Sequence, residues 1–322
     1  MTQPDTTQLH RFLVDHFNLE ELKTLCFNLG IEYEDLGGEG RSDKARELVR
    51  AMQRRTRLEH LVAHLSIARP DAYRQRFRET PAIPATQVRD RRIHEKTGIE
   101  LIRIPVGPFL YGNKSTLIEL TKFWIGRAPV TNDQFSRFVR ATGYETEAEC
   151  RGYGLHGLHA REGRIEGAEW QHPRGPESSI IGKIDYPVVQ VSWRDAQAFC
   201  NWAGLALPTE EQWEKAARGR DGRIWPWGNE SPTADHCNFN VNVGDTTPVG
   251  RYSPLGDSPY DCVDMAGNVL EWTGYRTGWE FAVAKGGAWL SDAEACQCGI
   301  THYGVQSVGH TGMGFRVVEV SS

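Results

Sequence analysis

Two capped helices are encoded by residues 186–219, which read YPVVQVSWRDAQAFCNWAGLALPTEEQWEKAARG. Ser192 precedes the first helical segment and Asp195 stands three residues later, the spacing of an N-terminal capping pair. Gly204 follows that segment, where glycine commonly ends a helix. Thr209 opens the second segment in the same way. The sequence therefore predicts two short amphipathic helices here.

Around these helices, regular structure is expected to be sparse. A third capped helix follows Thr131, and the segment ELIRIPVGPFLYG (100–112) alternates like strands interrupted by proline and glycine. Residues 225–269 show almost no periodicity. Such a chain needs large aromatic side chains, which can bond irregular backbone, or bound cations that tie loops together. We expect an α+β domain with little regular secondary structure.

Composition divides the chain in two. All ten tryptophans lie at or after Trp124, and only four of the 33 glycines precede residue 81. Residues 1–80 instead carry apolar side chains at helical spacing. We therefore expect a small all-α helical bundle in residues 1–80, a linker in 81–98, and the α+β domain in 99–322.

Charge and hydropathy exclude several classes of protein. The net charge is −5, whereas general nucleic-acid binding needs a basic footprint. No apolar run is long enough to cross a membrane, and the N-terminus lacks the charged and then apolar start of a secretory signal. We expect a cytoplasmic protein, with no nucleic-acid or membrane partner, whose seven cysteines stay reduced.

The first eighty residues predict several short helices. Asn18 and Glu21 form a capping box, Gly30 is placed to end that helix, and Ser42 is expected to cap the next. The segments FNLEELKTLCFNLGIEYEDL, SDKARELV and RLEHLV…RPD resemble bacterial effector-associated, death-fold-like adaptor domains. The resemblance implies that residues 1–80 recruit a helical adaptor partner. A solubilising helical cap is the alternative.

A series of motifs from residue 99 to 318 resembles the formylglycine-generating-enzyme, or sulfatase-modifying factor, family. In chain order these are PVTNDQFSRFVRATGYETEAE, WQHPRGP, the stretch quoted first, WPWGNE, TTPVGRYSP, YDCVDMAGNVLEWT, KGGAW and GMGFRVV. The resemblance implies a C-type-lectin-related fold with a ligand groove built from C-terminal loops.

The resemblance also locates the catalytic position of the family's oxidases. Those enzymes use two cysteines five residues apart, whose thiolates hold one Cu(I), a soft ion that prefers sulfur. Here the first position holds Ser291 and the second Cys296, with Cys298 as a possible substitute. Because one thiolate cannot supply a two-sulfur site, we expect no copper, no catalytic residues and no enzyme.

The C-terminal stretch indicates a binding role instead. Between the framework motifs GGAW and GFRVV, the residue type changes at almost every position. This texture resembles the variable region of diversity-generating-retroelement target proteins, whose scattered side chains bind a target. We expect a non-catalytic variable protein that binds a protein or peptide. The alternatives are a copper-dependent oxidase acting on sulfatase cysteines, or a fixed saccharide- or peptide-binding member of the family.

The expected contact residues lie in and just before this stretch, with large stiff aromatics among them. They are Trp279, Phe281, Leu290, Ser291, Asp292, Ala295, Cys298, Thr301, His302, Tyr303, Val305, Ser307, Val308, His310 and Thr311. Trp289 and Phe315, inside the framework motifs, are expected in the core instead.

The family resemblance implies two calcium sites. The first would use the carboxylates of Asp264 and Glu271 with the carbonyls of Gly267 and Val269. A second, less well matched in spacing, would use Asn238, the Phe239 carbonyl and Asp245. Hard oxygen ligands of this kind suit Ca²⁺. The alternative for the first site is that its carboxylates only bond turn backbone.

Overall fold

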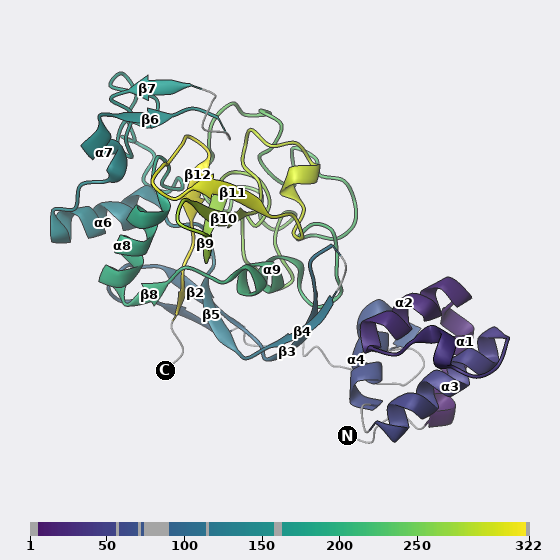
Figure 1. The fold of residues 1–322 in the computed structure, drawn as a ribbon. Coiled ribbons are helices and arrows are strands. Elements are labelled where there is room, and N and C mark those ends of the chain that lie inside the picture. Colours follow the sequence, from purple (N-terminus) through teal and green to yellow (C-terminus); the bar gives the residue numbers. More distant parts are fainter. Residues whose placement is uncertain are drawn as a thin grey trace.

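The computed structural model describes residues 6–55, 58–69, 72–73, 90–113, 116–157 and 163–319. The N-terminal part is helical, as expected. Its helices are α1 (Thr6–His16), α2 (Leu19–Leu29), α3 (Arg41–Arg54) and α4 (Leu58–Ala68). Figure 1 shows them packed around one another, and their apolar faces share one hydrophobic cluster that runs from Leu9 to Tyr73. The Asn18–Glu21 capping box and the left-handed Gly30 cap of α2 are both present.

One predicted cap is wrong. Helix α3 begins at Arg41 after Gly40, and no side chain caps it, so Ser42 lies inside the first turn. Gly40 adopts an extended conformation that any residue can take, and the choice of cap was set by the preceding loop.

The larger part contains two main sheets. The five-stranded sheet has the order β1-β2-β5-β13-β8, and the four-stranded sheet has the order β11-β10-β9-β12. The first consists of β1 (Arg91–Ile93), β2 (Glu100–Ile104), β5 (Phe123–Gly126), β13 (Val318–Glu319) and β8 (Leu205–Ala206). The second consists of β11 (His302–Val305), β10 (Phe281–Lys285), β9 (Leu270–Thr277) and β12 (Met313–Phe315). Only β12 and β9 pair in parallel within this second sheet.

Two hairpins and several short helices complete this part. The hairpins pair β3 (Gly107–Tyr111) with β4 (Thr116–Leu120), and β6 (Tyr153–Leu155) with β7 (Arg164–Glu166). The helices are α6 (Asn132–Thr142), α7 (Glu147–Arg151), α8 (Trp193–Ala203) and α9 (Glu210–Arg218). The predicted capping boxes of α6, α8 and α9 are confirmed. In Figure 1, α9 lies between the four-stranded sheet and the β3–β4 hairpin.

The core supports the expected α+β class with sparse secondary structure. One cluster joins α6 and α8 to the four-stranded sheet, where Trp272 and Phe315 are fully buried. Trp289, predicted as core, is only 2% exposed. Most of the predicted linker lies outside the described residues, so its bounds stay a prediction. Residues 91–93, which were assigned to it, form β1 and pair with β2. No helix in the described ranges is both long and apolar enough to cross a bilayer.

Candidate functional site

A hollow of about 280 Å³ opens beside the C-terminal loop. Strands β9, β11 and β12 and residues 290–295 form its walls. Its lining consists of Leu270, Leu290, Ser291, Asp292, Ala295, His302, Tyr303 and Met313. We call this space the Ser291 hollow. It brings together six of the predicted contact residues with Leu270 and Met313, framework residues that no local signal in the sequence marked as part of a site.

Local backbone interactions fix the loop that carries Ser291. Gly287 has a φ of +70°, and a Cβ there would lie 2.6 Å from Cys296 Sγ. The Ala288 N–H donates to Ser291 Oγ over 2.9 Å, and the Ala295 N–H donates to Asp292 Oδ1 over 2.8 Å. The loop therefore needs glycine at 287 and polar side chains at 291 and 292 to hold its shape.

Cys296 lies immediately behind this loop. Its side chain is fully buried. Burial raises the pKa of the Cys296 thiol to about 12, so the thiol is protonated at neutral pH. His302 Nε2 donates to the Ala295 carbonyl over 2.9 Å, which makes Nδ1 the accepting nitrogen of this ring.

The donor set does not fit a two-thiolate copper site. Ser291 offers a hydroxyl where a second thiolate would be needed, and its side chain is already bonded to the loop backbone. Cys298 packs in a separate cluster with Trp213 and Met265, so the spacing of Cys296 and Cys298 does not make them a pair. Burial raises the pKa of Cys298 to about 12 as well. No catalytic step is therefore derived through copper.

The remaining predicted contact residues differ widely in exposure. Trp279 is 97% exposed at the turn between β9 and β10, and Tyr303 is 62% exposed. Phe281 and Asp292 are also exposed, whereas Leu290, Ala295, Thr301, His302, Val305, Ser307 and Val308 are half-buried. Ser291, Cys298, His310 and Thr311 are buried, although Ser291 still lines the Ser291 hollow. The changing residue types along this stretch could not reveal which side chains are buried, because the loop folds back against β9 and α8.

The two carboxylates of the first predicted calcium site are already hydrogen-bonded. Glu271 Oε1 accepts from Arg316 over 2.7 Å, and its Oε2 accepts from Arg316 and from Trp213 Nε1. Asp264 Oδ2 accepts the Gly250 N–H over 2.6 Å. Arg316 is fully buried and supplies the positive charge that a cation would bring. The Gly267 and Val269 carbonyls, the other two predicted ligands, stay a prediction as well.

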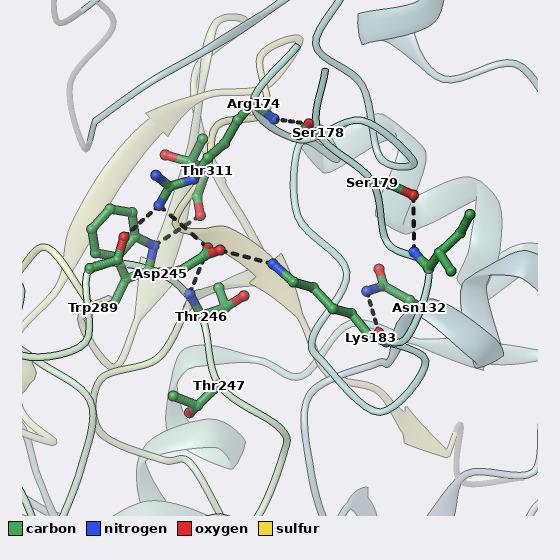
Figure 2. A network of polar contacts seen from close by, with 12 residues as sticks. Asn132, Arg174, Ser178, Ser179, Lys183, Asp245, Thr246, Thr247, Trp289 and Thr311 are labelled. Carbon is green, nitrogen blue, oxygen red and sulfur yellow. Dashed lines mark hydrogen bonds and ion pairs between the residues drawn. The ribbon is translucent and has the colours of Figure 1, made fainter. Parts of the chain in front are cut away.

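At the second predicted calcium site, Asp245 pairs with side-chain cations, whereas Asn238 Oδ1 is buried without a hydrogen-bond partner among the described residues. Figure 2 shows the Asp245 carboxylate between Lys183 and Arg174. Lys183 Nζ lies 3.0 Å from Asp245 Oδ2, and an Arg174 nitrogen lies 3.5 Å from Oδ1. Asn238 donates to the Asp245 carbonyl over 2.8 Å, and the Phe239 carbonyl accepts the Asn242 N–H. Within the described residues, no cluster of three His, Cys, Asp or Glu side chains is arranged for a metal ion.

Nothing in the sequence predicted that Lys183 and Arg174 belong to this site. They lie 62 and 71 residues from Asp245, in a loop without periodicity. Glu271 and Asp245 each pair with a protein cation, and calcium at either site stays a prediction.

Asp264 predicts a measurable pH dependence. Burial is the main cause that raises the pKa of Asp264 from 3.8 to about 6. The folded state therefore favours the neutral carboxyl, and its contribution to stability is present at low pH and is lost as pH rises from about 4 to 6. Asp264→Asn keeps an oxygen acceptor for Gly250 and tolerates the left-handed φ of 54°.

At pH 8 we expect the free energy of unfolding of Asp264→Asn to exceed that of the wild type by up to about 3 kcal/mol. Near pH 4 the two proteins should be equally stable. Urea titrations at both pH values measure this difference. Asp235→Asn, at an exposed carboxylate, is the matched control. Equal stabilities of wild type and Asp264→Asn at pH 8 would contradict the prediction.

Comparison with known proteins assigns the larger part of the chain. Residues 87–320 match the model of the sulfatase-modifying factor enzyme 1-like domain. The chain belongs to this family. The formylglycine-generating enzyme of Thermomonospora curvata is 37% identical over 224 residues, which span 56% of this chain and 73% of that protein. The inactive C-alpha-formylglycine-generating enzyme 2 of Bos taurus is 33% identical, over 61% of this chain and 78% of that protein.

The fold is shared with a solved structure of lower sequence identity. Treponema denticola variable protein 1 aligns with a TM-score of 0.51 and 20% identity, over 72% of this chain and 99% of that structure. This likeness confirms the predicted resemblance in fold. It does not extend to function at that identity.

The prediction of a non-catalytic variable protein is wrong. Several relatives of this family domain are formylglycine-generating enzymes, which places the chain in an enzyme family.

The helical part has its own match. Residues 9–70 match effector-associated domain 7, as the sequence predicted. Leu19 and Phe27 of α2 are 43% and 81% exposed. Contact of this domain with another helical adaptor stays a prediction, as do the cytoplasmic location and the absence of nucleic-acid partners.

Proposed function

We propose that residues 87–320 form an oxidising enzyme that converts a cysteine of a polypeptide into an aldehyde. The observation that carries the proposal is the Ser291 hollow, which lies against Cys296 in a domain whose relatives are named formylglycine-generating enzymes. The hollow is large enough for one side chain and opens to solvent along Tyr303.

The reaction requires dioxygen and a thiol reductant. The substrate CH₂–SH becomes CHO, its sulfur leaves as H₂S, dioxygen is reduced to one water and the aldehyde oxygen, and two reductant thiols become one disulfide. The chain's own residues supply positioning and proton transfer. His302 lines the hollow, and its imidazole is the side chain there that is suited to take the substrate thiol proton.

Cys296 is the cysteine that the chain retains at the family's second catalytic position, and Cys296→Ser tests whether it takes part in the reaction. The purified full chain is incubated with a cysteine-containing polypeptide, dioxygen and dithiothreitol, with and without Cu(I), and aldehyde is captured with hydroxylamine while oxygen uptake is recorded. We expect Cys296→Ser to lose at least about 100-fold in rate, which is the usual scale for loss of a reacting group. Cys150→Ser, at an exposed cysteine, should keep the wild-type rate.

Two results would overturn the proposal. One is the absence of aldehyde in every arm, with folded protein verified by thermal unfolding. The other is undiminished activity of Cys296→Ser. Dependence on added Cu(I) would show that substrate or reductant thiols complete a site that the chain's residues do not.

A further inference from the structure

The turn formed by Asn240 and Val241 has an unusual backbone. Both residues are left-handed, with φ values of 49° and 57°. Asparagine tolerates this conformation, whereas valine, which is branched at Cβ, is an outlier there. The Val241 side chain is 53% exposed, so its burial offsets little of the cost. Strain of this kind persists only where other contacts hold it, and it is common at functional sites.

Two backbone hydrogen bonds hold the turn against the loop that carries Ser291. The Asn240 N–H donates to the Ser291 carbonyl over 2.7 Å, and the Val241 N–H donates to the Trp289 carbonyl over 2.8 Å. These two acceptors stand on either side of Leu290, which lines the Ser291 hollow. The left-handed turn therefore directs two successive N–H groups at one wall of the hollow.

The two ends of this wall are held differently. At one end, Trp289 is 2% exposed and its Nε1 donates to the Thr311 carbonyl over 3.0 Å (Figure 2). At the other end, the Ser291 hydroxyl is bonded within the loop itself, to the Ala288 N–H. The hydrogen bond from Asn240 is what ties the Ser291 end to another segment of the chain. We expect the wall to move at this end, when that bond opens.

The wall covers a thiol that the proposed reaction needs. Cys296 has no exposed surface, and its Sγ lies 2.6 Å from the position that a Cβ on Gly287 would take. A molecule in the Ser291 hollow therefore reaches this thiol only when the wall moves. The cost of a left-handed valine and the net gain from two hydrogen bonds are of the same order, so the closed state is only modestly favoured.

We propose that the Asn240–Val241 turn is a strained latch that controls access to Cys296 through the wall of the Ser291 hollow. With the latch closed, the wall positions Leu290 and Ser291 and covers the thiol. With the latch open, the strain at Val241 is released and the thiol becomes accessible. The proposal rests on the proposed function only in making Cys296 a reacting group, and the latch is measured without substrate.

Val241→Asn tests the strain, because asparagine adopts the left-handed conformation more readily than valine and so favours the closed latch. In the full chain we expect hydrogen exchange to give the Asn240 amide a protection factor about five-fold higher than in the wild type. The matched control is Val243→Asn, at a valine that is 45% exposed and outside the left-handed region. It should leave the protection factor within about two-fold of the wild-type value.

Labelling of Cys296 with N-ethylmaleimide, followed by peptide mass spectrometry, tests access to the thiol. We expect Val241→Asn to slow this labelling by about five-fold. Val241→Pro should accelerate it at least five-fold, because proline has no N–H and cannot adopt a positive φ. Two internal controls are present in every sample: Cys150, which is exposed, and Cys200, which is buried in the core beside α8.

The controls separate opening of the latch from unfolding of the domain. Labelling of Cys150 should be the same in all variants, and labelling of Cys200 should stay slow. If Val241→Pro accelerates labelling of Cys200 as well, it has opened the whole domain, and Val241→Asn decides the question.

An unchanged protection factor of the Asn240 amide in Val241→Asn would overturn the proposal. Unchanged labelling of Cys296 in that variant would overturn it too, because the turn would then be strained without controlling the thiol. Failure of the oxidase assignment is seen separately. Slower labelling of Cys296 without aldehyde formation in any arm would keep the latch and remove the proposed reaction, and aldehyde formation with unchanged labelling would do the reverse.

Discussion

Arg316→Met is expected to lower the free energy of unfolding by about 3–5 kcal/mol, the usual cost of leaving a buried charge without its partner. Both Arg316 and Glu271 are fully buried. Arg316 also donates to the Gly126, Arg127 and Val263 carbonyls at 3.0–3.1 Å. Methionine fills much of the volume of the arginine side chain but donates no hydrogen bond to these carbonyls.

Chemical denaturation measures this loss, with Arg137→Met as the matched control. Arg137 pairs with Asp133 at the surface of α6, and its removal should cost less than about 1 kcal/mol. The double variant Glu271→Met/Arg316→Met should recover part of the loss, since the lone carboxylate is gone, but the unpaired carbonyls remain. A single variant within 1 kcal/mol of wild type would contradict the assignment of a stabilising buried pair.

Glu214→Leu should destabilise the protein by a similar amount, about 3–5 kcal/mol, because it removes a buried anion from its cations. Glu214 is fully buried and pairs with Lys285 over 3.0 Å and with Arg218 over 2.7 Å. It also accepts the Gly112 N–H over 2.6 Å. Leucine would remove the acceptor of the buried Lys285 ammonium and of the Gly112 N–H, and would leave Arg218 with carbonyl acceptors but no opposite charge.

Glu214→Gln separates charge from shape in this cluster. Glutamine retains an oxygen for Gly112 and loses only the negative charge, so its unfolding free energy should lie between those of Glu214→Leu and wild type. Urea unfolding of the three proteins at one pH gives the order. If Glu214→Leu were as stable as wild type, Lys285 and Arg218 would have to find other acceptors, and the cluster would not tie α9 to β10.

Local features of this fold could be predicted because they depend on neighbours in the sequence. The capping boxes at Thr131, Ser192 and Thr209 each join residues three apart, and the structure contains all of them. The exception, at Ser42, arose where the preceding loop set the start of α3. The core roles of Trp289 and Phe315 followed from framework motifs.

The candidate site was only partly predictable. Six residues of the Ser291 hollow lie in one stretch of sequence, and that proximity was visible. Whether a side chain in that stretch faces solvent depends on the segments packed against it, which come from elsewhere in the chain. Ser291 was therefore expected at a surface and is buried, with its hydroxyl fixed to the Ala288 backbone.

The sequence by itself determined the helical start of the chain, the family of the larger domain and the replacement of a cysteine by Ser291. Only the tertiary structure decided the electrostatics. Glu271 meets Arg316 across 45 residues, and Asp245 meets Lys183 across 62. A carboxylate in a sequence can serve a metal ion or a protein cation equally well, and the choice depends on which charge the fold brings within about 3 Å.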